Sequence, residues 1–233
     1  LNLADFTARV NADLVGKFVN LASRCAGFIE KRFAGRLADA LPDATQYTRF
    51  VSTLDGVREA YERNDPASAI RQLMALADEA NKYIDEHKPW VLAKQEGADA
   101  QLQAVCTQGL NLFRVLAAGL APVLPRTSAQ AAAFLEAPVH AWSDLDAPLV
   151  AHAINPYAPL FTRIDHKHID AMTDASKDTL AAAPAKPVEA KKAEAAQAPP
   201  LLQPSPASAK GSESHIGIED FAKLDLRIGK VLE

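Results

Sequence analysis

Apolar residues recur along most of the chain with the spacing of three and four that is typical of amphipathic helices. The clearest run is a stripe spaced 4, 3, 4 and 3 residues apart, formed by Leu14, Phe18, Leu21, Cys25 and Phe28. Asn11 is the predicted N-cap of this helix, which we expect to continue to about Phe33, with Gly35 after its end. The stripe predicts a long helix with one face in a hydrophobic core.

Cap residues and prolines divide the next part of the chain into further helices. Asp65 followed by Pro66 predicts an N-cap with proline in the first helical position, and Pro89 predicts the end of the same helix. Later, two prolines end another helix and Ser128 is a predicted cap. The further helices are expected over residues 43–63, 66–88, 90–94, 98–120, 128–137 and 169–180. Their antiparallel packing predicts a mainly α fold, a helical bundle.

The pattern changes after residue 182. Residues 183–215 combine scattered prolines with Ala, Lys, Glu and Ser and have no apolar periodicity, which predicts a disordered linker. Residues 216–233 open with one turn of helix and continue with a period of two over Leu224, Leu226 and Ile228, as a strand does. This segment is too short to fold alone. We therefore expect a helical domain over residues 1–182, a linker, and the first strand of a truncated β domain.

Composition limits the kinds of partner. The formal net charge of -4 gives no overall attraction for nucleic acid, so RNA binding would have to come from a local site. Cys25 and Cys106 are too few for a disulfide framework or a zinc site, which favours a reducing, cytoplasmic setting. No segment has the roughly 18 consecutive apolar residues that would indicate a membrane span, and no export signal is seen.

Asn20 and Arg24 lie four residues apart on one flank of the first predicted helix, beside its apolar stripe. The amide of Asn20 offers a donor and an acceptor, and the guanidinium of Arg24 offers a planar fork of donors. This pair suits the flat edge of a nucleobase. The spacing fits equally well an ordinary pair at the rim of a helix, satisfied by water or by a neighbouring helix.

Pro89 and Trp90 stand at the break between two predicted helices, where Trp90 is outside every apolar stripe. An exposed Trp there is a platform on which an unpaired base can stack, and Pro89 limits the motion of the turn. Lys88 and Lys94 flank this pair and are candidates for contacts with phosphates. The competing interpretation is that Trp90 caps one end of the bundle core.

Hydrolytic and metal chemistry find little support in the sequence. His166 and His168 are two residues apart, so on a helix they point to different sides, and no carboxylate pair completes a site. We interpret the segment from Asp165 to His168 as a solvated helix start. Phosphate-binding loops, dinucleotide-binding glycine patterns and nucleophile elbows are all missing from the sequence.

Four blocks in a fixed order closely resemble the anticodon-binding domain of bacterial methionyl-tRNA synthetases. They are residues 18–24 (FVNLASR), 75–83 (ALADEANKY), 88–95 (KPWVLAKQ) and 111–114 (NLFR). A fifth block, residues 218–228 (IEDFAKLDLRI), resembles the start of the OB-type tRNA-binding domain that many members carry after a linker. The resemblance implies that Asn20 and Arg24 read base edges of the CAU anticodon, and that Trp90 stacks on its first base, on a platform shaped by Pro89.

The resemblance also implies activities for which this chain has no residues. The parent enzyme attaches methionine to its tRNA with ATP, in a catalytic domain that also carries a zinc-binding insertion. That domain would lie before Leu1, so the chain is expected to be a piece that binds but does not catalyse, with no catalytic or metal-binding residues of its own. The expected partners are the anticodon loop of methionine tRNA, the catalytic domain, and a second copy through the OB-type domain. Residues 155–164 are expected to link the bundle to the catalytic domain.

Two alternatives stay open at this point. The chain could be a helical scaffold that binds a partner protein, with Trp90 as the anchor of an interface. It could also be the anticodon domain of another class I synthetase, such as the valine or the cysteine enzyme, which shares the helical bundle. The pair Pro89 and Trp90, the spacing of Asn20 and Arg24, and the OB-like tail favour the methionine enzyme.

Overall fold

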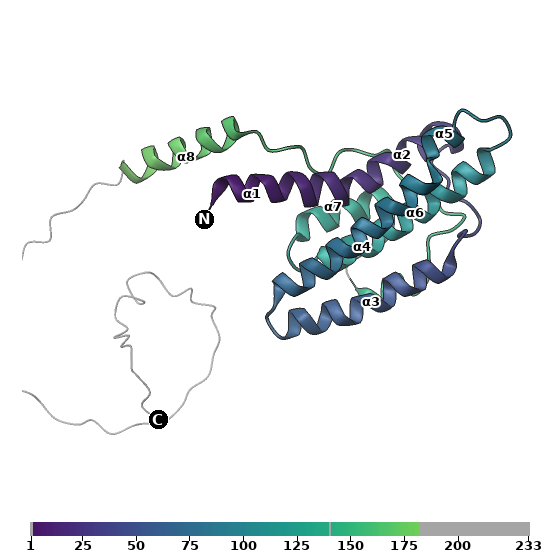
Figure 1. The fold of residues 1–233 in the computed structure, drawn as a ribbon, viewed down its shortest axis with the longest axis horizontal. Helices are drawn as coiled ribbons and strands as arrows, with labels where there is room; N and C mark the ends of the chain where they lie inside the picture. The colour runs from purple at the N-terminus through teal and green to yellow at the C-terminus, as the bar shows by residue number, and fades with distance from the viewer. Residues whose placement is uncertain (1, 140, 182–233) are drawn as a thin grey trace, which may run out of the picture. The chain divides into compact units, whose positions relative to one another are not determined.

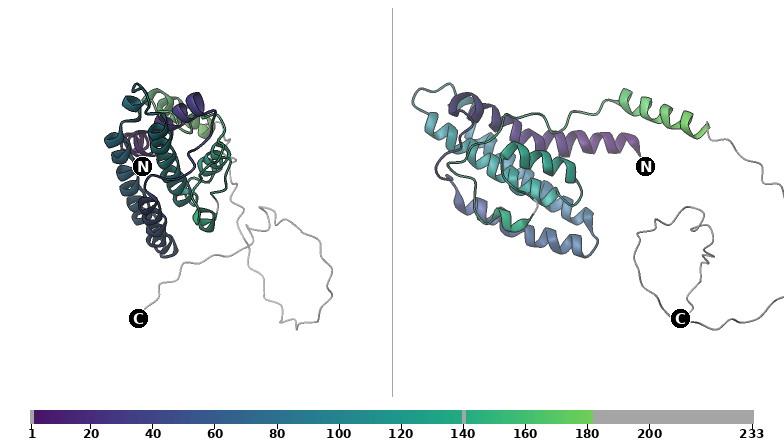
Figure 2. Two further views of the ribbon diagram at one scale, coloured as in Figure 1. Left: turned by 90° about the vertical axis from the view of Figure 1, so that its right-hand side faces the viewer. Right: turned by 180° about the vertical axis from the view of Figure 1, so that it is seen from behind.

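The structure is a computed structural model that describes residues 2–139 and 141–181, and these residues form a mainly helical domain (Figure 1). The predicted linker and the predicted OB-type strand lie outside the described residues. The helices are α1 (Leu3–Arg9), η1 (Val10–Val19), α2 (Asn20–Phe33), α3 (Ala44–Glu62), α4 (Pro66–His87), α5 (Pro89–Leu92), α6 (Asp99–Leu120), α7 (Pro125–Leu135), η2 (Trp142–Leu145) and α8 (His166–Ala181). Figure 2 shows the long helices side by side along one direction.

The predicted first helix exists, but it begins earlier than expected. Asn2 is its N-cap, and α1, the π-helix η1 and α2 then follow one another without a break. The prediction that Asn11 caps this helix was wrong. The Asn11 amide instead exchanges two hydrogen bonds with the backbone of Ile164, at 3.0 Å and 2.8 Å. Asn11, which the sequence predicts to be a cap, therefore joins two segments that are far apart in the chain.

Other predicted helix starts are confirmed by their caps. The Asp43 carboxylate accepts a hydrogen bond from the backbone N–H of Gln46, and Asp65 does the same for Ser68, with Pro66 at the first helical position. Ser128 is not a cap, because α7 already begins at Pro125. The Ser128 hydroxyl donates to the carbonyl of Ala117, at 2.7 Å, and so fastens α7 to α6.

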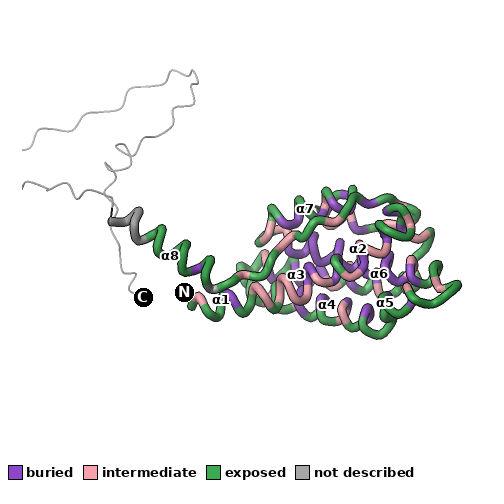
Figure 3. The backbone as a smooth tube through the Cα atoms, turned by 90° about the horizontal axis from the view of Figure 1, so that it is seen from above, coloured by how far each residue is buried: buried purple, intermediate pink, exposed green. Residues whose placement is uncertain are grey.

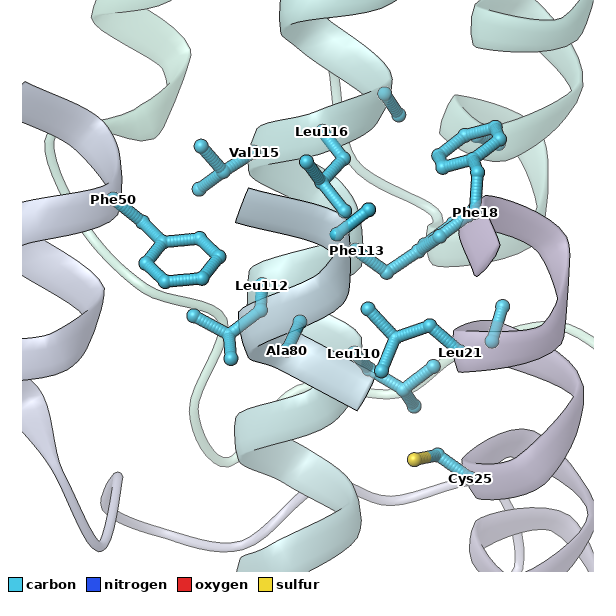
Figure 4. Packing of buried hydrophobic residues seen from close by; sticks show 14 of the residues in the cluster. Phe18, Leu21, Cys25, Phe50, Ala80, Leu110, Leu112, Phe113, Val115 and Leu116 are labelled. Atoms are coloured by element: carbon cyan, nitrogen blue, oxygen red, sulfur yellow. The ribbon is translucent and has the colours of Figure 1, made fainter. Parts of the chain in front are cut away.

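Helix α6 is the central element, and it is buried along most of its length between α2, α3, α4 and α7. In Figure 4 the side chain of Phe50 approaches it from α3, and those of Phe18, Leu21 and Cys25 approach from the other side. The rings of Phe18 and Phe113 stack with centroids 4.8 Å apart. The predicted stripe is thus largely confirmed as core, although Leu14 and Phe28 are only partly buried.

The segment after α7 is irregular and is held to the bundle by buried polar side chains. Asn111 exchanges hydrogen bonds with the backbone of Leu149, at 2.9 Å and 2.7 Å. Arg114, which is 3% exposed, donates to the carbonyl oxygens of Pro138, Asp144 and Ala147. These contacts satisfy backbone groups that would otherwise be buried without partners. Buried residues lie inside the bundle in Figure 3, whereas α8 is mainly exposed.

Across the described ranges, no helix combines the length and apolar character required to cross a membrane.

Candidate nucleic-acid interface

The structure brings Arg24 and Trp90 into direct contact. Arg24 lies on α2 and Trp90 on α5, and the guanidinium carbon of Arg24 is 4.6 Å from the centre of the Trp90 ring. At this distance the cation interacts with the electron-rich face of the indole. Two residues that are far apart in the sequence therefore form one surface.

Helix α5 presents Trp90 outward while its first and last residues are buried. Lys88 takes the left-handed conformation, with φ of 46°, and ends α4. Pro89 then starts α5 with its ring buried, and Leu92 is also buried. Trp90 between them is 38% exposed and is among the exposed large hydrophobic residues of the described chain. This placement matches the prediction of an outward-facing ring and not that of a core cap.

Arg24 is held by a second helix as well as by Trp90. Its Nη2 atom lies 2.5 Å from the Oδ1 atom of Asp85 on α4, and its side chain is 21% exposed. The guanidinium is therefore fixed between an acidic side chain and an aromatic ring. Fixing a long side chain in this way lowers the entropy that it loses when a ligand binds.

Asn20 lies one turn before Arg24 and belongs to a separate polar network. Its Nδ2 atom is 3.4 Å from Oδ1 of Asn81 on α4, while the Asn81 amide donates to the carbonyls of Lys17 and Ala77. Within the described part of the chain, the Oδ1 atom of Asn20 accepts no hydrogen bond. Arg24 and Trp90 border a hollow that Asn20 does not line, so the structure brings together only part of the predicted set in one hollow.

Two neighbouring hollows extend along this face of α2. The first has a volume of about 340 Å³ and is lined by Ser23, Arg24, Gly27, Phe28, Lys31 and Trp90. The second measures about 410 Å³ and is lined by Val15, Gly16, Val19, Asn20, Ser23, Tyr157, Pro159, Phe161 and Arg163. Ser23 lines both hollows, so they adjoin. Each falls within the roughly 300–1,000 Å³ that small-ligand sites occupy.

Several residues of this face were missed by sequence reasoning. Phe28 was assigned to the core stripe, yet it is half-buried and lines the first hollow. Asp85 and Lys31 carried no signal beyond the ordinary polar positions of a helix, and Tyr157 was noted only as part of the segment expected to link the bundle to the catalytic domain. Lys88 and Lys94, the candidates for phosphate contacts, are exposed near the two ends of α5.

Among the described residues, the His and Cys side chains singled out in the sequence do not gather into one site. In the ranges that the structure covers, no cluster of three or more His, Cys, Asp or Glu side chains is placed to hold a metal ion. Helix α8 begins at His166, and Asp165 Oδ1 accepts a hydrogen bond from the backbone N–H of Lys167, as expected for a capped helix start. Cys25 and Cys106 are both fully buried. Contact with Cys25 and burial together raise the pKa of the Cys106 thiol.

The chain belongs to the family of the anticodon-binding domain of methionyl tRNA ligase, whose family model matches residues 38–177. This finding confirms the resemblance seen in the sequence, and it favours the methionine enzyme over the valine and cysteine enzymes.

Curated relatives extend the similarity over the whole chain. The methionine–tRNA ligase of Xanthomonas campestris pv. campestris (strain B100) is 70% identical over 233 residues, which is 100% of this chain and 34% of that protein. The enzyme of Xanthomonas oryzae pv. oryzae (strain PXO99A) is 70% identical over 234 residues, with the same coverage. The chain thus spans about a third of the length of these relatives.

A solved structure shares the fold. The free-state methionyl-tRNA synthetase of Mycobacterium tuberculosis superposes with a TM-score of 0.62 and 25% sequence identity, covering 68% of this chain and 34% of that one.

Proposed function

We propose that this chain recognises the CAU anticodon of methionine tRNA, as the anticodon-binding part of an enzyme that attaches methionine to tRNA with ATP. The observation that carries the proposal is the contact between Arg24 and Trp90 at the edge of an open hollow. A flat ring beside a planar fork of donors is suited to an unpaired base, because it supplies a stacking face and hydrogen bonds to the edge of the base.

Trp90 provides the stacking surface. Base stacking on an aromatic side chain contributes about 1–3 kcal/mol and tolerates any base, since every base has a π face. Trp90 therefore supplies affinity without sequence preference. The preference for CAU has to come from hydrogen-bonding groups beside the ring.

Arg24 and Asn20 provide those groups. Arg24 borders the same hollow as Trp90, and Asn20 borders the adjoining one, so the two side chains can meet successive nucleotides. Oδ1 of Asn20 is an acceptor without a partner in the described chain, and it can receive a hydrogen bond from a base amino group. Pro89 is buried, so its effect on the RNA is indirect: it fixes the start of the turn that carries Trp90.

Residues 155–164 contact η1, which continues directly into the helix that carries Asn20 and Arg24, and they suit a role in communication with the catalytic domain. The Tyr157 hydroxyl is 3.5 Å from the carbonyl of Val19, and Ile164 is fastened to Asn11. A base that moves Asn20 would therefore act on a helix already joined to this segment. The same proposal includes a catalytic domain with ATP and zinc sites. It also includes an OB-type domain, which joins two copies in some relatives. The proposed location is the cytoplasm.

A titration tests the central claim. The chain is titrated with a hairpin bearing CAU and with an otherwise identical hairpin bearing another triplet, at one fixed salt concentration because phosphate contacts depend on salt. We expect tighter binding of the CAU hairpin. Equal affinity for the two hairpins would contradict anticodon recognition, and no binding to either would favour the protein-scaffold alternative.

A further inference from the structure

Arg32, two turns beyond Arg24 on α2, ties the turn that carries Trp90 to the bundle. Its Nη2 atom donates a hydrogen bond to the carbonyl oxygen of Ala93, the C-cap residue of α5. Its Nη1 atom lies 2.7 Å from Oδ1 of Asp99, the first residue of α6. One guanidinium thus holds both ends of the loop that joins α5 to α6.

Helix α5 needs such a tie because it is very short. It contains four residues, and an isolated helix of one turn is unstable since few backbone hydrogen bonds form for the residues that are ordered. The last carbonyls of a helix also lack partners inside the helix. Arg32 supplies one of them with a charge-assisted hydrogen bond, which is stronger than a neutral one. The buried Pro89 and Leu92 hold the first and last residues of the same helix.

We propose that Arg32 is a positioning residue that sets the orientation of the Trp90 ring relative to Arg24. This proposal rests on the proposed function. Both arginines lie on α2, so the spacing between the hydrogen-bonding fork of Arg24 and the stacking face of Trp90 is fixed by one helix. Without Arg32, the loop from Ala93 to Asp99 loses both of these contacts, and the turn that carries Trp90 is less well ordered before the RNA binds. Ordering a side chain at an interface weakens binding.

The competing role for Arg32 is a direct contact with phosphate, because its side chain is 40% exposed. The two roles predict opposite effects of Asp99→Asn. If Arg32 acts by clamping the loop, losing the Asp99 carboxylate loosens the clamp and weakens binding. If Arg32 binds phosphate, the same change releases it from an ion pair and strengthens binding.

The binding experiment uses the full chain and the CAU hairpin at several salt concentrations. Arg32→Ala is expected to lose between about 2-fold and 10-fold in affinity, as follows from roughly 0.5–1.5 kcal/mol for one newly ordered side chain. The dependence of affinity on salt is expected to stay unchanged. Arg32→Lys keeps the charge but cannot bridge Ala93 and Asp99 with one planar group, so it should recover affinity only in part.

Arg63→Ala is the matched control, because Arg63 is an exposed arginine paired with Glu59 at the end of α3 and its removal changes the net charge equally. It should bind as the unaltered chain does. A smaller salt dependence in Arg32→Ala, together with stronger binding by Asp99→Asn, would overturn the proposal in favour of a phosphate contact. Unaltered affinity in Arg32→Ala would overturn it as well.

A measurement without RNA separates this proposal from the proposed function. In a Trp142→Phe background Trp90 is the remaining Trp, and quenching of its fluorescence by acrylamide reports its accessibility. Arg32→Ala should increase quenching while the far-ultraviolet circular dichroism stays unchanged, and Arg63→Ala should do neither. If the unaltered chain fails to prefer CAU but quenching changes as expected, the anticodon function fails and the positioning of Trp90 stands. Unchanged quenching in Arg32→Ala overturns the positioning role itself.

Discussion

The guanidinium of Arg24 covers part of one face of the Trp90 ring, with its carbon 4.6 Å from the ring centre. A base that stacks on this face must displace Arg24, and a base on the opposite face leaves it in place. An exposed cation–π contact is worth about 0.5–1 kcal/mol and an exposed ion pair about 0–1 kcal/mol. Base stacking, at about 1–3 kcal/mol, is comparable with their combined loss of about 0.5–2 kcal/mol. The free energy of base stacking can therefore compensate for the contacts that Arg24 loses with Asp85 and with the Trp90 ring.

Trp90→Ala should weaken binding of the CAU hairpin by about 1–3 kcal/mol, because it removes the stacking surface. The helix content should stay unchanged, since the Trp90 side chain is 38% exposed. Binding is measured by titration and helix content by circular dichroism. Val91→Ala is the control, because Val91 is the next residue of α5 and is 40% exposed. A loss of helix content in Trp90→Ala would show that the ring supports the core instead.

Arg24→Lys should reduce the preference for CAU more than it reduces binding in general. Lysine keeps the charge beside Asp85 but has no planar fork, so it cannot form two parallel hydrogen bonds with a base edge. Such a bidentate contact discriminates between bases by about 1–3 kcal/mol. The measurement is the ratio of affinities for the CAU hairpin and a hairpin with another triplet. An equal loss for both hairpins would instead assign Arg24 to phosphate binding.

Two helical glycines should respond in opposite ways to replacement by alanine. A Cβ atom at Gly109 on α6 would lie 2.7 Å from the Cys25 sulfur and 2.9 Å from Cδ1 of Ile84. A Cβ atom at Gly27 on α2 would meet nothing within 4 Å. Gly109→Ala should therefore destabilise the fold by about 1–3 kcal/mol through overpacking, and Gly27→Ala should stabilise it by about 0.5–1 kcal/mol. Urea unfolding at equilibrium measures both changes, and shifts of the same sign would contradict the packing that the structure shows.

Helix positions could be predicted from the sequence wherever a local signal was sufficient. Asp65 and Pro66 mark the start of α4 as expected, because the N-cap bond and the missing proline N–H depend only on neighbouring residues. Asn11 and Ser128 were also predicted to be N-caps, but neither caps a helix. Their partners are Ile164 and Ala117, which the local sequence cannot reveal. Whether such a side chain caps its own helix or bonds to a distant segment is therefore decided by the tertiary structure.

The candidate site shows a similar division. The outward position of Trp90 followed from its place after Pro89, and the shared flank of Asn20 and Arg24 followed from helical spacing. The contact between Arg24 and Trp90 could not be predicted from the sequence, because it depends on how α5 packs against α2. Arg32 was missed for the same reason, since its partners become neighbours only when the loop between α5 and α6 folds back. Whether these residues bind RNA stays a prediction.

The two native cysteines should be inert toward a thiol reagent while the chain is folded. Cys25 and Cys106 are fully buried, and the pKa of Cys106 is raised by its contact with Cys25 and by burial, so little reactive thiolate forms. Colorimetric titration with an aromatic disulfide should detect no thiol in buffer and two per chain in denaturant. A thiol that reacts rapidly in the folded chain would contradict this packing.

A cysteine placed at Ser23 gives the same reagent access to the candidate site. Ser23 is exposed and lines both hollows, so Ser23→Cys should react rapidly in the folded chain, in contrast to the native thiols. If the anticodon fills these hollows, the CAU hairpin should protect this thiol, since the reagent and the RNA compete for one space. A hairpin with another triplet, at the same concentration, should protect it less. Equal labelling rates with saturating CAU hairpin and without RNA would place the RNA elsewhere on the bundle.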